Sequence, residues 1–154
     1  MDYDRKDAVK HVVHDYVYLV AAGTDVQRPQ KHPFNHYAER TFLIHCRAFG
    51  EFFSDRRNDR DNRDLRAQDF TRTPFARSVP IWVQWRDHID KHLMHLTKSR
   101  ITNKIPWTGE PNKCILEEFR AVWNEFLSEL KDEVRPLFED EINKHRRDFV
   151  GYHF

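Results

Sequence analysis

Hydrophobic residues recur along this chain every three or four positions, the spacing of amphipathic helices, and no stretch alternates as a strand would. The spacing predicts four long helices, at roughly residues 4–20, 35–53, 78–100 and 113–134, with a short terminal helix over roughly 138–149. Asn35 and Ser78 are suitable N-caps, Gly23 is a candidate stop for the first helix, and Pro136 is expected to break the fourth.

These elements predict an all-α fold, an antiparallel four- to five-helix bundle that forms a single domain over residues 1–154. A long charged loop, residues 54–66, separates the second and third predicted helices. Loops of this length in compact bundles are usually functional or disordered. The run is expected either to be solvated or to contact phosphate groups through Arg56, Arg57 and Arg60.

The amino-acid composition narrows the possible fold classes and functions. Aromatic residues make up 14% of the chain, so large rings can fill a core although only 39% of residues are hydrophobic. Only 4 Gly occur, which argues against a turn-rich β-sandwich and against glycine-rich phosphate loops, so we expect no cofactor. The net charge of +1 provides no global attraction to nucleic acid or to a membrane.

The expected setting is cytoplasmic. No apolar run approaches the roughly 18 residues that span a bilayer, and the first residues, MDYDRKD, do not resemble a secretory signal. Cys46 and Cys114 lie in apolar contexts without CxxC spacing, which favours buried, reduced thiols.

The candidate chemistry is concentrated between Arg86 and His95, where three His, one Lys and one Arg fall within ten residues. On a helical wheel, Arg86 and His92 border the buried stripe on opposite flanks. His45 lies within the apolar stripe of the second helix, so it is expected to be buried and to need a hydrogen-bond partner, such as Arg86 or His92. It is either a core histidine that fixes packing or a member of a catalytic cluster.

A metal site is an alternative for the same helix. His88, His92 and His95 have spacing that permits a shared ion, although no Glu stands between them as in the HExxH pattern.

Two segments of the sequence resemble segments of a group of small bacterial proteins. Residues 42–53, FLIHCRAFGEFF, resemble the "FLLHARNLIDFF" helix of small uncharacterised bacterial all-helical proteins, and residues 89–100, IDKHLMHLTKSR, are similar to their "INKxVAHLTxxR". That group looks like the HEPN superfamily, which includes metal-independent ribonucleases. Its signature is an Arg followed, after four to six residues, by a His, and Arg86 with His92 matches it. The sequence has Asp87 where the best-known form has Asn.

The resemblance implies an endoribonuclease or RNA-binding domain in a toxin or phage-defence setting, acting as a homodimer. Arg86 would hold the scissile phosphate and His92 or His95 would transfer protons, with His45 as a further candidate catalytic residue. Lys91 and Arg100, with the loop arginines, would bind the RNA backbone. The alternatives are a non-enzymatic module that binds a protein partner, with structural histidines, and a His-ligated metal-binding bundle.

Overall fold

The computed structural model describes residues 4–28, 34–54, 64–94 and 110–154, and all of their side chains except those of residues 34–36, 81, 88, 90–94 and 110–111. The described part contains six helices: α1 (Arg5–Val26), α2 (Phe34–Phe53), α3 (Ala67–Phe70), α4 (Pro80–Met94), α6 (Glu110–Ser128) and α7 (Arg135–Asp148). It contains no strand, only an isolated antiparallel bridge between Thr71 and Leu130. The predicted all-α class is confirmed.

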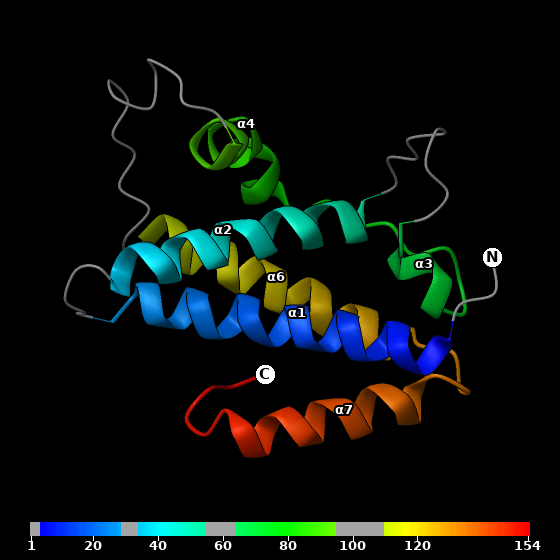
Figure 1. Ribbon diagram of the computed structural model, residues 1–154. Coiled ribbons are helices and arrows are strands. Elements are labelled where there is room, and N and C mark those ends of the chain that lie inside the picture. Colours follow the sequence, from blue (N-terminus) through cyan, green and yellow to red (C-terminus); the bar gives the residue numbers. More distant parts are fainter. Residues whose placement is uncertain (1–3, 29–33, 55–63, 95–109) are drawn as a thin grey trace.

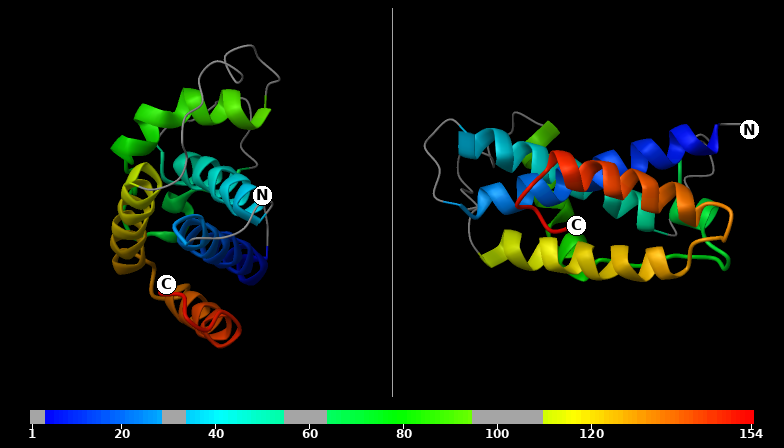
Figure 2. Two further views of the ribbon diagram at one scale, coloured as in Figure 1. Left: turned by 90° about the vertical axis from the view of Figure 1, so that its left-hand side faces the viewer. Right: turned by 90° about the horizontal axis from the view of Figure 1, so that it is seen from below.

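The helices α1, α2, α6 and α7 run lengthwise, with α1 and α7 pointing in one direction and α2 and α6 in the other (Figure 1). Helix α1 contacts α2, α6 and α7, so it lies at the centre of the bundle. Helix α4 instead crosses the others and packs on α2 and α6, as the end-on view of Figure 2 shows. The fourth lengthwise helix is therefore α7, and the third long helix predicted from the sequence lies across the bundle.

The first helix does not end at Gly23, as predicted, but continues to Val26. Gly23 is buried in the helix, and a Cβ atom at this position would lie 2.7 Å from Cε2 of Phe42. The glycine therefore allows a close approach between α1 and α2 rather than a stop.

The fourth predicted helix also has a different end. Helix α6 ends at Ser128, and the segment that follows forms backbone hydrogen bonds with the segment after α3: the N–H of Lys131 donates to the carbonyl of Phe70 (2.9 Å), and that of Arg72 to the carbonyl of Glu129 (2.9 Å). Pro136 does not end this helix but lies in the first turn of α7, where its missing N–H costs nothing.

Aromatic side chains fill much of the core. Tyr16 of α1 stacks on Trp123 of α6 with ring centroids 3.9 Å apart. Around them lie Phe49, Phe52, Phe53, Phe70, Phe75, Phe126 and Phe138. The large rings thus compensate for the modest number of hydrophobic residues, as expected.

Both cysteines are free thiols, but only Cys46 is buried, while Cys114 is half-buried. Complete burial raises the pKa of the Cys46 thiol well above its ordinary value. Within the described ranges, every helix is too short or too polar to span a bilayer.

Candidate functional site

Arg86 of α4 is fixed against α2. Its Nη2 atom donates to Oε1 of Glu51 over 2.5 Å, and the two side chains are 30% and 35% exposed. The local sequence explains this contact. Trp82 lies one turn before Arg86 and is buried against Gly50, the residue before Glu51. Packing of the indole on the glycine therefore places the guanidinium beside the carboxylate.

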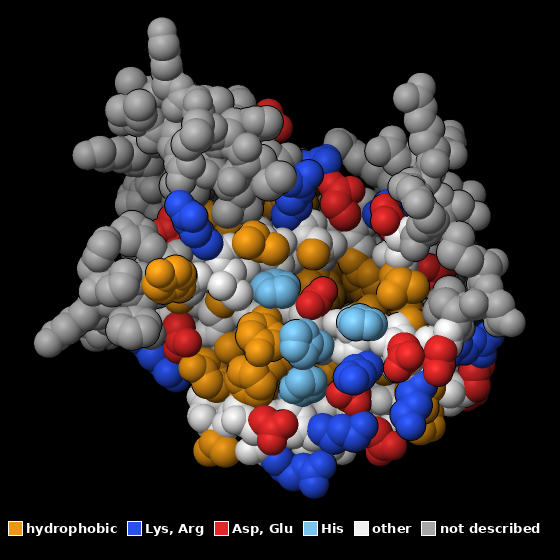
Figure 3. Space-filling view, in the orientation of Figure 1, with side chains coloured by type: hydrophobic (Ala, Val, Ile, Leu, Met, Phe, Trp, Pro, Cys, Tyr) orange, Lys and Arg blue, Asp and Glu red, His pale blue; other side chains and the backbone are white. Residues whose placement is uncertain are grey.

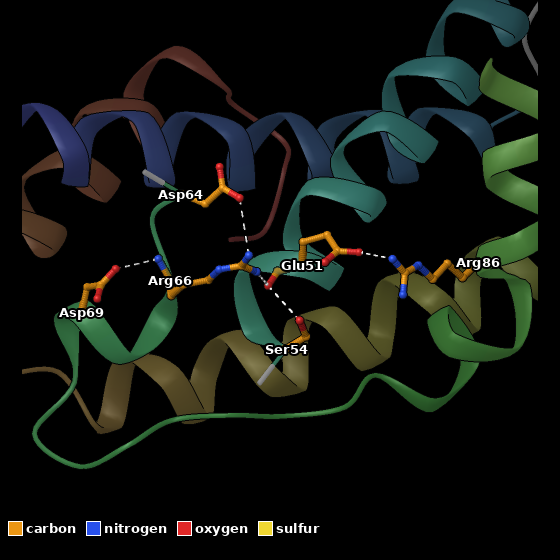
Figure 4. A network of polar contacts seen from close by, with 6 residues as sticks. All are labelled: Glu51, Ser54, Asp64, Arg66, Asp69 and Arg86. Atoms are coloured by element: carbon orange, nitrogen blue, oxygen red, sulfur yellow. Dashed lines mark hydrogen bonds and ion pairs between the residues drawn. The ribbon is translucent and has the colours of Figure 1, made fainter. Parts of the chain in front are cut away.

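The end of α2 beside this pair is held by a second arginine (Figure 4). The Arg66 guanidinium donates to the carbonyl of Glu51 and lies 3.5 Å from a carboxylate oxygen of Asp64. The Ser54 hydroxyl donates to the same carbonyl over 3.1 Å. Carbonyls in the last turn of a helix have no partner within it, and these donors supply one. Glu51 is consequently held through its backbone by Arg66 and through its side chain by Arg86.

His45 faces a different helix from the one predicted. Its ring lies 6.0 Å from that of Tyr18 on α1, and its buried Nδ1 has no hydrogen-bond partner among the described residues. Burial lowers the pKa of this imidazole, His14 lowers it further, and only Asp15 opposes the shift. The ring is half-buried and favours its neutral form at pH 7. The expectation that Arg86 is its hydrogen-bond partner is wrong, because Arg86 pairs with Glu51.

A group of histidines that the sequence did not indicate lies on the face shown in Figure 3. His14 of α1 stands 5.8 Å from His145 of α7, ring centroid to ring centroid, and 4.5 Å from Tyr18. Nδ1 of His145 is buried without a hydrogen-bond partner. Among the side chains that the structure describes, no group of three or more His, Cys, Asp or Glu residues is arranged to hold a metal ion. The spacing His14–Tyr18 places two rings on one face of α1, but only the packing of α7 brings His145 there.

The other predicted site residues remain predictions. His92 and Lys91 belong to α4, but their side chains lie outside the described part, as does that of His88. His95, Arg100 and the loop residues Arg56, Arg57 and Arg60 lie outside the described residues altogether. Of the predicted site residues, the side chains of Arg86 and His45 are therefore the ones that the structure describes, and no hydrogen bond or ion pair joins them.

Comparison with protein-family models, with curated proteins and with solved structures finds no match.

Proposed function

We propose that this chain is a HEPN-like RNA-binding domain that acts in the cytoplasm as a metal-independent endoribonuclease, in a toxin or phage-defence setting. The observation that carries the proposal is the position of Arg86. Its guanidinium is fixed by Glu51, remains 30% exposed, and stands on the same helix as His92, in the order that the resemblance implies. A pre-positioned guanidinium that is open to solvent offers directed donors to a phosphate group.

The reaction would be a transesterification within the RNA. The imidazole of His92 or His95 accepts the proton of a ribose 2′-hydroxyl, whose oxygen attacks the phosphorus. The bond from phosphorus to the 5′-oxygen breaks, and that oxygen takes up a proton from an imidazolium or from water, which leaves a 2′,3′-cyclic phosphate and a free 5′-hydroxyl. Arg86 donates to the non-bridging oxygens and offsets the charge that develops on them. No step requires a metal ion.

The remaining candidates take different roles. Lys91, Arg100 and the loop arginines Arg56, Arg57 and Arg60 would neutralise RNA phosphates and hold the strand in register. The neighbours of His45 that the structure describes, Tyr18 and Asp15, belong to α1, and Arg86 is paired with Glu51, so the candidate catalytic role of His45 stays a prediction.

The test is cleavage of mixed RNA by the full chain, with and without EDTA. The wild type is compared with Arg86→Ala, His92→Ala and His95→Ala. Arg147→Ala and His153→Ala are matched controls, because both residues are exposed and belong to the C-terminal part of the chain. The proposal predicts cleavage that survives chelation and persists in the two control variants. Cleavage should disappear in Arg86→Ala and in His92→Ala, His95→Ala or both. Intact RNA with the wild type contradicts nuclease activity. A separate measurement of RNA affinity tests the binding site, and equal affinity of the wild type and Arg86→Ala contradicts RNA binding at Arg86.

We infer a second candidate function, a non-enzymatic interaction module, from the exposed face of α2. Tyr37 is 66% exposed and Ile44 is 54% exposed, and residues seven positions apart lie on the same side of a helix. A second copy of this chain carries the same apolar face, so two copies can bury these side chains against each other. Such a pair is the homodimer that the resemblance implies. Light scattering of the wild type and of Ile44→Glu tests this: a dimer that becomes a monomer in the variant supports the interface, and a monomeric wild type contradicts it.

A further inference from the structure

A cavity of about 450 Å³ opens between α1, α2 and residues 64–66. Its apolar lining comes from Val12 of α1, from Phe49 and Phe52 of α2, and from Leu65. Figure 3 shows the surface hollowed between α1 and α2, with hydrophobic side chains at the bottom of the hollow. Sites that bind small molecules usually occupy about 300–1,000 Å³ and combine an apolar lining with a few polar groups. The size and lining of this cavity fit that description.

The polar groups of the cavity have a predominantly negative charge. Three carboxylates line it, Asp15, Glu51 and Asp64, together with the guanidinium of Arg66 and the imidazole of His11. The charge of Glu51 is offset from outside the cavity by its ion pair with Arg86. Arg66 is itself engaged, since it donates to the carbonyl of Glu51 and pairs with Asp64.

Asp15 is the carboxylate with the least compensation. Its side chain is 47% exposed, and Nδ1 of His14 lies 3.5 Å from its carboxylate. His45 also interacts with Asp15 electrostatically, and His11 lines the same cavity. These neighbours are imidazoles, which carry a positive charge only when they are protonated. The mouth of the cavity on the α1 side therefore presents a carboxylate that is open to a ligand.

We propose that this cavity binds a small organic cation that has an apolar, ring-sized body and one protonated amine. The hydrocarbon body is buried against Val12, Phe49 and Phe52, and the ammonium group pairs with Asp15. The phenyl faces add a favourable field for a cation. The proposal does not rest on the proposed RNA contact at Arg86, although Glu51 belongs to both places: it lines the cavity and pairs with Arg86.

The charge requirement is tested with three probes of similar size: 2-phenylethylamine, 2-phenylethanol and 3-phenylpropanoate, which carry a positive, a neutral and a negative group at pH 7. Each is titrated into the isotopically labelled full chain, and the amide shifts are followed by NMR. The amine is expected to bind most tightly and to shift amides of residues 11–15, 48–52 and 64–66, the propanoate least. Equal affinity for the amine and the alcohol overturns the proposal, and so does the absence of saturable shifts with the amine.

Two variants locate the site. Asp15→Asn keeps the shape of the side chain and removes its charge, so the affinity for the amine is expected to fall about two- to fivefold, as for a partly exposed ion pair. Ala48→Trp fills the cavity from its rim and is expected to abolish binding of all the probes. Glu117→Gln, an exposed charge change on α6, is the matched control and should leave the affinity unchanged. Far-UV circular dichroism verifies that each variant is folded. Unaltered amine binding in both Asp15→Asn and Ala48→Trp overturns the assignment of the site.

Discussion

Gly50 sets how closely α4 approaches α2, so Gly50→Ala tests the packing that positions Arg86. A Cβ atom at this position would lie 2.7 Å from Cδ1 of Trp82 and would overlap the indole at Nε1 and Cε2. Trp82 is only 3% exposed, so the ring has no free space into which it can turn. The substitution must therefore push α4 away from α2 or distort both helices.

Two opposing effects determine the size of the change. Replacing a glycine by alanine inside a helix gains roughly 1 kcal/mol of helix propensity. Overpacking a well-filled core costs about 1–3 kcal/mol, and the overlap with several ring atoms of Trp82 places Gly50→Ala in the upper half of that range. The free energy of unfolding is therefore expected to fall by about 1–2 kcal/mol.

Urea unfolding followed by far-UV circular dichroism measures this difference. In a Trp82→Leu background the overlap is removed, and the same Gly50→Ala change is expected to stabilise the protein by roughly 1 kcal/mol. Ala121→Gly, at an exposed position of α6, calibrates the propensity contribution in this chain. Stabilisation by Gly50→Ala in the wild-type background, or an equal loss in both backgrounds, would refute the close packing of Trp82 on Gly50.

Three further predictions concern single polar side chains. Glu51→Gln removes the carboxylate that fixes Arg86; because both side chains are about one-third exposed, stability should fall by less than about 1 kcal/mol. RNA cleavage should fall because the guanidinium is no longer held in place, and unchanged cleavage would contradict the role of this pair in positioning Arg86. The lowered pKa of His45 means that the unfolded chain takes up this proton more readily, so stability should decrease as pH falls through the ordinary histidine value of 6.5. Melting temperatures between about pH 7.5 and 5.5 should depend less on pH in His45→Gln, and an unchanged slope would count against this shift. Tyr152→Phe removes the hydroxyl that donates to Asp25 over 2.9 Å; it should cost about 0.5–1.5 kcal/mol and speed hydrogen exchange after residue 148, whereas unchanged exchange would show that this contact does not hold the C-terminal segment.

The helices and the aromatic core follow from local information. A face such as Phe42, Phe49 and Phe52 has to be buried, and its spacing of seven and then three residues is that of a helix. The hydrophobic spacing does not reveal whether a glycine within such a pattern ends the helix or allows another helix to pack closely on it. Gly23 has the low propensity of a helix stop, yet it lies in a helix because Phe42 of the next helix packs on it. A glycine that stops a helix and a glycine that allows close packing are distinguished only by the residue that packs on them in the folded protein.

Partners between helices were the least predictable part of the candidate site. The position of His45 in an apolar stripe predicted a ring in need of a partner, and its buried Nδ1 has none among the described residues. The stripe did not indicate whether the ring would face α1 or α4. Glu51, the partner of Arg86, carries no local signal, because its role depends on the crossing of α4 over Gly50. The same is true of His145, which reaches His14 only through the packing of α7 on α1.

In the proposed function, RNA contacts the protein at Arg86, where α4 crosses α2. Ultraviolet cross-linking of the full chain to a uridine-rich RNA, followed by mass spectrometry of the cross-linked peptides, locates this contact. Cross-links are expected in peptides from α4 and from the C-terminal half of α2, strongly reduced in Arg86→Ala and unaltered in Arg147→Ala. Cross-links confined to α7, or equally abundant in wild type and Arg86→Ala, would contradict it.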